Sequence, residues 1–74
     1  MFKKGDIIID LGDGPEAKLY PYGIVEKVEG AHLLAFWGRT LEEVRKSPYK
    51  GMALRTSITR VKLCMKNWKE LLQR

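Results

Sequence analysis

Few residues in this chain have the types and spacing that catalysis requires. The only histidine, His32, lies in an apolar stretch, where an imidazole is more commonly packed than catalytic. The single cysteine, Cys64, has neither a second cysteine nor a histidine near it in the sequence to complete a metal site or to act as a base. We therefore expect a non-enzymatic protein without a metal or another cofactor.

Four carboxylates gather in the first part of the chain, around a glycine-rich stretch. Their spacing does not match a calcium-binding loop. The stretch Gly12-Asp13-Gly14-Pro15 is not followed by the Gly-Lys-Ser or Gly-Lys-Thr that a phosphate-binding loop requires. This region is therefore interpreted as a solvated turn. The four carboxylates belong to Asp6, Asp10, Asp13 and Glu16.

Charge is distributed very unevenly along the chain. Residues 1–44 hold five lysines and arginines against eight aspartates and glutamates, whereas residues 45–74 hold nine against one. A cluster of cations raises the local concentration of polyanions. The basic second half therefore favours an anionic partner such as nucleic acid, and an ordinary solvated basic face is the alternative.

Hydrophobic patterning predicts a single, mainly β domain over residues 1–74. Strands are expected at residues 5–10, 20–28, 31–37, 52–56 and 60–64, followed by an amphipathic helix at about residues 65–73. A loop of about eight residues separates the first two strands. Because the strand at 31–37 is apolar on both faces, we expect it to be the most central strand of the sheet.

Several short signals refine this outline. Glu29-Gly30 between two apolar runs indicates a tight hairpin, and Gly23 suggests a bend or bulge. Thr40 followed by Glu43 forms a capping box, which predicts one helical turn. In the strand at 52–56, Met52 and Leu54 should face one side of the sheet, and Ala53 and Arg55 the other.

The order of these elements resembles the SH3-like small β-barrel of KOW and Tudor-type proteins. Lys4-Gly5-Asp6 before Ile7-Ile8-Ile9 is similar to the first strand of such barrels, and Tyr22-Gly23-Ile24-Val25 to the start of their second strand. Ser57-Ile58-Thr59 falls where a helical turn precedes their last strand. The resemblance covers residues 2–64 and implies a five-stranded barrel of a kind that binds DNA, RNA, proline-rich peptides or methylated tails.

In such a barrel the last two strands would be antiparallel neighbours. Arg55, Arg60 and Lys62 would then point outward together as a phosphate-binding face. Aromatic side chains at the loop edges would supply stacking platforms for bases or peptides. The predicted nucleic-acid-binding residues are Arg45, Lys46, Lys50, Arg55, Arg60, Lys62, Lys66, Tyr20, Tyr22, Trp37 and Tyr49.

The sequence as a whole indicates a small binding module in the cytoplasm. A single cysteine allows no intramolecular disulfide, and no apolar run is long enough to span a membrane. Nucleic-acid binding is the leading hypothesis. The alternatives are a protein-interaction adaptor, such as a small phage or accessory protein that modulates a larger machine, and a structural subunit of an assembly. Trp68, Leu71 and Leu72 of the closing helix either cap the core or form an interface.

Overall fold

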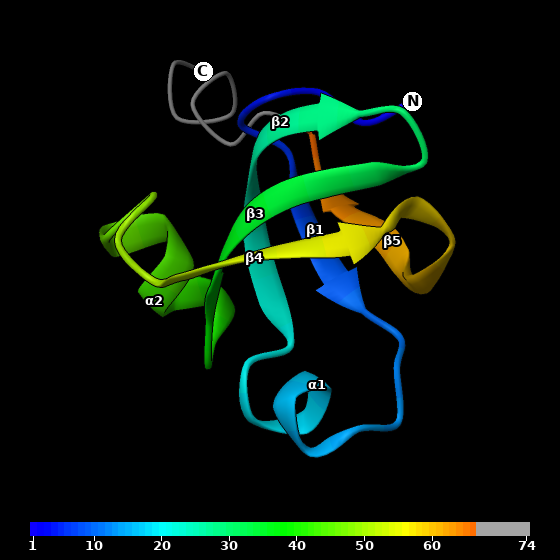
Figure 1. The fold of residues 1–74 in the computed structure, drawn as a ribbon. Helices are drawn as coiled ribbons and strands as arrows, with labels where there is room; N and C mark the ends of the chain where they lie inside the picture. The colour runs from blue at the N-terminus through cyan, green and yellow to red at the C-terminus, as the bar shows by residue number, and fades with distance from the viewer. Residues whose placement is uncertain (67–74) are drawn as a thin grey trace.

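Five strands form one antiparallel sheet in the computed structural model, which describes residues 1–66 (Figure 1). They are β1 (Ile7–Asp10), β2 (Tyr22–Glu29), β3 (His32–Gly38), β4 (Met52–Ser57) and β5 (Val61–Met65). Each boundary lies within two residues of the predicted one, so the predictions of a mainly β fold and of five strands are confirmed. The predicted helix at about residues 65–73 lies almost entirely outside the described residues, and Met65 itself ends β5.

The strand order in the sheet is β4-β3-β2-β1-β5. Strand β2, not β3, is therefore the middle strand, although β3 is internal and packs on both faces as predicted. Strands β4 and β5 lie at opposite edges, so they are not the antiparallel neighbours that a closed barrel would make them. In the described part of the chain the sheet stays open between these two edges.

The connection between β4 and β5 explains why they separate. A 3-10 helix, η1 (Ile58–Arg60), occupies the predicted helical turn, and the Ser57 hydroxyl accepts a hydrogen bond from the Thr59 N–H. The carbonyl of Arg60 then accepts a bond of 2.8 Å from the N–H of Leu11. This bond holds the chain against the end of β1, so β5 pairs with β1 and does not run back along β4.

The two faces of the sheet carry separate hydrophobic clusters. On the inner face of the curved sheet the first cluster centres on Ile8, Val25, Leu33, Ala35, Trp37 and Val61. On the opposite face Ile7 and Ile24 pack with Val44 of the short helix α2 (Leu41–Lys46), in the second cluster. Consecutive residues of a strand point to opposite faces, which is why neighbours such as Ile7 and Ile8 enter different clusters.

Two irregular positions and a second short helix complete the fold. The sheet is bulged between Val25 and Lys27 and again between Ile7 and Ile8, whereas Gly23 keeps its regular pairing. The predicted loop between β1 and β2 contains a five-residue helix, α1 (Pro15–Leu19). Proline at the first position suits a helix because that N–H has no intrahelical partner. Helix α1 lies below the sheet in Figure 1.

Candidate binding site at the open edge

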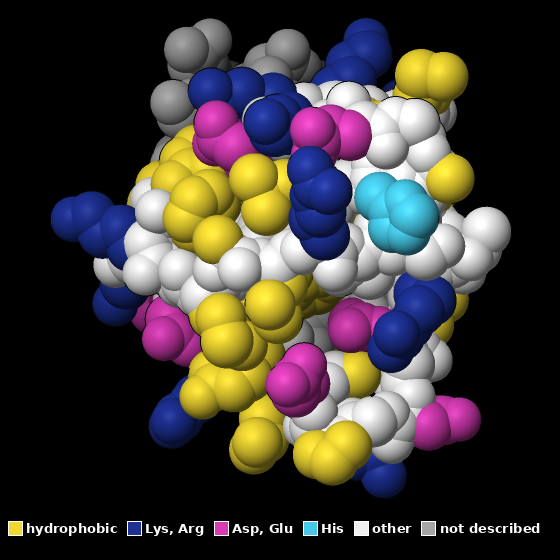
Figure 2. Space-filling model, in the orientation of Figure 1, with side chains coloured by type: hydrophobic (Ala, Val, Ile, Leu, Met, Phe, Trp, Pro, Cys, Tyr) yellow, Lys and Arg dark blue, Asp and Glu magenta, His cyan; other side chains and the backbone are white. Residues whose placement is uncertain are grey.

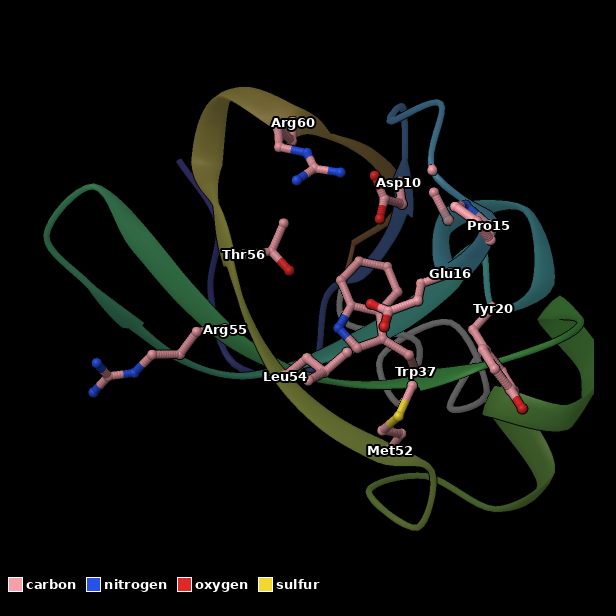
Figure 3. Close-up of a pocket in the computed structure, with 12 residues that line it drawn as sticks. Asp10, Pro15, Glu16, Tyr20, Trp37, Met52, Leu54, Arg55, Thr56 and Arg60 are labelled. Atoms are coloured by element: carbon pink, nitrogen blue, oxygen red, sulfur yellow. The ribbon is translucent and has the colours of Figure 1, made fainter.

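A cavity of about 430 Å³ lies where the sheet fails to close, and we call it the seam cavity. One wall is β4, and the opposite wall is built from α1, the end of β1 and η1 (Figure 3). From β4, Met52, Leu54 and Thr56 contribute, because their partners in β3 place them on the inner face of the sheet. The predicted alternation of Met52 and Leu54 against Ala53 and Arg55 is therefore confirmed.

Trp37 lies at the centre of the seam cavity (Figure 3). It is only 4% exposed and pairs across the sheet with Gly23 on one side and Met52 on the other. A Cβ atom on Gly23 would lie 2.9 Å from the indole ring, so the glycine makes room for it. Within residues 1–66 the buried Trp37 Nε1–H has no hydrogen-bond acceptor, which is costly for a buried donor.

The β4 wall of the seam cavity is apolar and accessible. Met52 is 41% exposed and Leu54 36%, although both face inward, because no element within residues 1–66 crosses the seam to cover them. Tyr20 and Pro15 contribute apolar surface from the other wall. Figure 2 shows hydrophobic side chains gathered over β4 and down toward α1. An accessible apolar cavity beside a buried aromatic ring is typical of a binding site.

Charged side chains line the rim opposite β4. Asp10 and Glu16 bring carboxylates to the seam cavity, and Arg60 brings a guanidinium that points toward Asp10 (Figure 3). One Asp10 oxygen accepts a hydrogen bond of 2.8 Å from the Gly12 N–H. In the described part of the chain, neither Glu16 nor Arg60 has a hydrogen bond or an ion pair through its side chain.

Arg55 contributes to the lining of the seam cavity, but its charged group points away from it (Figure 3). Its guanidinium lies 3.0 Å from a carboxylate oxygen of Glu29, on the outer face of the sheet. Lys62 is exposed on β5, at the opposite edge. The predicted common face of Arg55, Arg60 and Lys62 is therefore wrong, because it assumed that β4 and β5 pair.

The other predicted basic residues are spread around the molecule. Arg45 and Lys46 lie on α2, where Lys46 forms an ion pair of 3.0 Å with Glu42 one helical turn earlier. Lys50 lies in the loop before β4, and Lys66 follows β5. None of these four lines the seam cavity.

The predicted aromatic residues divide between the two faces. Tyr20 and Trp37 line the seam cavity, whereas Tyr22 and Tyr49 pack in the second cluster. The Tyr49 ring meets Phe36 edge to face, with ring centres 5.8 Å apart, and the Lys4 ammonium lies 5.7 Å from its centre. Burial raises the pKa of the Tyr49 phenol, and the Glu26 carboxylate raises it further.

Sequence reasoning missed eight of the twelve residues that line the seam cavity. Asp10 and Glu16 were noted only as part of an acidic turn, and Met52 and Leu54 were predicted only to share one face of the sheet. The signal available in the sequence was the alternation in β4, which places its apolar side chains on one face. It does not reveal that this face is left uncovered, because that depends on which strands form the edges.

The histidine and the cysteine do not line the seam cavity. His32 is exposed at the start of β3, and Cys64 is exposed on β5. Within residues 1–66 no three side chains among histidine, cysteine, aspartate and glutamate are arranged to hold a metal ion.

Among the same residues no helix is both long and apolar enough to cross a membrane.

Comparison of the chain with protein-family models, with curated proteins and with solved structures gave no match.

Proposed function

We propose that this chain is a non-enzymatic binding module whose seam cavity takes a segment of another protein. The observation that carries the proposal is the accessible apolar wall of Met52 and Leu54 beside a buried Trp37 whose N–H lacks an acceptor within residues 1–66. Protein interfaces are built on such anchors, with aromatic rings and apolar surface at the centre and polar groups at the rim. Asp10 and Glu16 disfavour a polyanion at this position.

The finer resemblance to SH3-like barrels is part of this proposal. The strand order β4-β3-β2-β1-β5 and the 3-10 helix before the last strand support it. The fold by itself assigns no ligand, since small β folds serve many functions. A cytoplasmic location is proposed on the single exposed thiol, Cys64, which a reducing compartment would keep free.

A pull-down with two matched variants tests the protein-binding proposal. Leu54 and Leu63 have almost equal exposure, 36% and 37%, but lie on opposite edges of the sheet. Leu54→Glu places a charge in the seam cavity, and Leu63→Glu places the same charge on β5. From nuclease-treated lysate, we expect wild type and L63E to retain a common partner and L54E to lose it. Retention by all three variants, or by none, would contradict the proposal.

Nucleic-acid binding is the second candidate function. The observation that favours it is that residues 45–66 carry seven lysines and arginines and no acidic residue. Contact with phosphates makes affinity fall steeply with salt, because each contact releases bound counterions. The binding surface would then be the outer face and the β5 edge, away from the carboxylates of the seam cavity.

A salt titration with labelled single-stranded DNA and RNA tests this second candidate. Three cations of the outer face and the β5 edge are reversed in the triple variant Arg55→Glu, Lys62→Glu and Lys66→Glu. The matched control reverses three lysines of the first half: Lys3, Lys18 and Lys27. Nucleic-acid binding predicts a strong loss in the first variant only. Equal losses in both variants, or no binding at low salt, would rule this function out.

A further inference from the structure

In the part of the chain that the structure describes, strand β4 is a free edge of the sheet. It pairs with β3 along its whole length, from Met52 opposite Trp37 to Ser57 opposite His32. Within residues 1–66 its backbone forms no hydrogen bond to any element other than β3 between residues 52 and 56. In an antiparallel strand, alternate residues direct their N–H and C=O groups away from the paired neighbour. The outer side of β4 therefore carries a row of donors and acceptors.

The seam cavity runs beside this edge. Its β4 wall takes in Met52, Leu54 and Thr56, which are alternate residues along the strand. The opposite wall is α1 and η1 of the same chain, so the space next to β4 is bounded on both sides. Such a space admits one extended chain more readily than the edge of a second folded sheet, which argues against another copy of this protein as the occupant.

The groups on the floor and rim of the cavity indicate which chemical groups the bound chain would contribute. The Trp37 Nε1–H is buried and, within the described residues, has no acceptor, so a carbonyl entering from the ligand would relieve its desolvation cost. Among the described residues, the charges that face the cavity are the carboxylates of Asp10 and Glu16 and the guanidinium of Arg60. Two negative groups against one positive group favour a cationic side chain in the ligand.

We propose that an extended segment of a partner protein adds to the free edge of β4 as a sixth strand. One of its carbonyl groups accepts a hydrogen bond from Trp37 Nε1, and a lysine or arginine of the segment lies against Glu16. Main-chain hydrogen bonds to β4 supply affinity, and the seam cavity selects the inward side chains. This inference rests on the proposed protein-binding function and specifies how the segment binds.

The test uses the full chain and a displayed library of random linear peptides of about twelve residues, long enough to cover an edge strand. Enriched peptides are synthesised and added to the nitrogen-15-labelled protein. We expect them to slow hydrogen exchange at alternate amides of β4, those that β3 leaves unprotected. We also expect a downfield shift of the Trp37 indole proton and an excess of lysine and arginine in the enriched sequences.

Two further measurements distinguish strand addition from simple filling of the cavity. Methylation of single peptide nitrogens should weaken binding at every second position, because only alternate N–H groups face β4. Leu54→Glu should weaken the peptide by about tenfold or more, as loss of one buried leucine contact implies, and Leu63→Glu should leave it unchanged. Methylation that has equal effects at all positions would contradict the strand geometry.

The remaining outcomes separate the inference from the proposed function. Peptides that bind but protect only α1 or η1, and leave the β4 amides unchanged, would overturn strand addition while preserving a protein-binding site. Failure to enrich any peptide on the folded chain would overturn both. Movement of the Trp37 indole signal by single-stranded DNA, or concentration-dependent dimerisation that L54E abolishes, would assign the edge to nucleic acid or to a second copy.

Discussion

Trp37 is held between two glycines that allow the backbone and the neighbouring strand to approach it closely. Gly23 faces the indole ring across β2 and β3, and a Cβ on Gly51 would collide with the Trp37 carbonyl oxygen. The position of the ring at the centre of the seam cavity therefore depends on residues that carry no side chain. The geometry of the cavity is therefore set by these glycines as well as by the tryptophan.

Replacement of Gly23 by alanine should displace the indole and destabilise the protein. The added methyl would lie 2.9 Å from two ring atoms, and overpacking of this kind costs about 1–3 kcal/mol. Urea unfolding measures the loss. Gly14→Ala is the control, since a Cβ there meets nothing within 4 Å and the backbone φ of −70° suits alanine. Equal stability of G23A and G14A would show that the ring is not confined as described.

Tyr49 should make the protein sensitive to alkaline pH. Burial, and then the Glu26 carboxylate, hold the pKa of its phenol above the ordinary value of 10.0. The unfolded chain therefore loses this proton at a lower pH than the folded one. The contribution to stability is complete below pH 10.0 and is lost as the pH rises through the folded pKa. Denaturation from pH 9 to about pH 11.5 should show a steeper decline for wild type than for Tyr49→Phe. Parallel curves for the two proteins would contradict this account.

At the scale of the element, two side-chain hydrogen bonds stabilise the N-terminus of the short helix α2. The Thr40 hydroxyl accepts a hydrogen bond of 3.0 Å from the Glu43 N–H, and the Glu43 carboxylate accepts one of 2.9 Å from the Arg39 N–H. The predicted capping box thus forms, with the return bond made to Arg39, the residue before the cap. Through Val44, this helix covers the second cluster.

Removal of the cap should cost a measurable part of the stability. Thr40→Ala deletes the acceptor for an otherwise unpaired N–H, and such changes cost about 1 kcal/mol. Thr40→Ser keeps the oxygen and should remain within about 0.5 kcal/mol of wild type. Thermal unfolding followed by circular dichroism compares the two variants. A serine variant as unstable as the alanine variant would show that the threonine methyl, and not the hydroxyl, matters here.

Elements with strong local signals were predictable from the sequence. The hairpin at Glu29-Gly30 exists because Gly30 adopts a φ of +63°, and the 3-10 helix follows from the Ser57 cap. Helix α1 was missed because it has one buried apolar residue, Ala17, and so no periodic pattern, while its Gly14-Pro15 start also fits a loop. Short helices of this kind are determined by contacts that the sequence does not reveal locally.

At the scale of the whole molecule, the sequence wrongly predicted that the distant strands β4 and β5 pair with each other. The alternation within β4 was correctly inferred, but whether the edges of β4 and β5 meet depends on the course of η1 and its bond to Leu11. That single difference moves Arg55 and Lys62 to opposite edges. It also opens the seam cavity, so the site that the structure presents combines four predicted residues, Tyr20, Trp37, Arg55 and Arg60, with residues of β1, α1 and β4 that were not predicted to belong to it.

The uncovered edge of β4 also bears on the solubility of the protein. A free strand with Met52, Ala53 and Leu54 exposed in succession is the kind of segment from which ordered aggregates grow. Arg55 follows these residues in β4, and its side chain is 67% exposed. Its charge opposes the growth of such aggregates. Arg55→Val should shorten the lag before thioflavin-positive fibrils form, and Lys62→Val on β5 is the control. If fibril formation starts at β4, a peptide bound to this edge should delay it. A ligand of the cavity would then also protect the folded protein from aggregation.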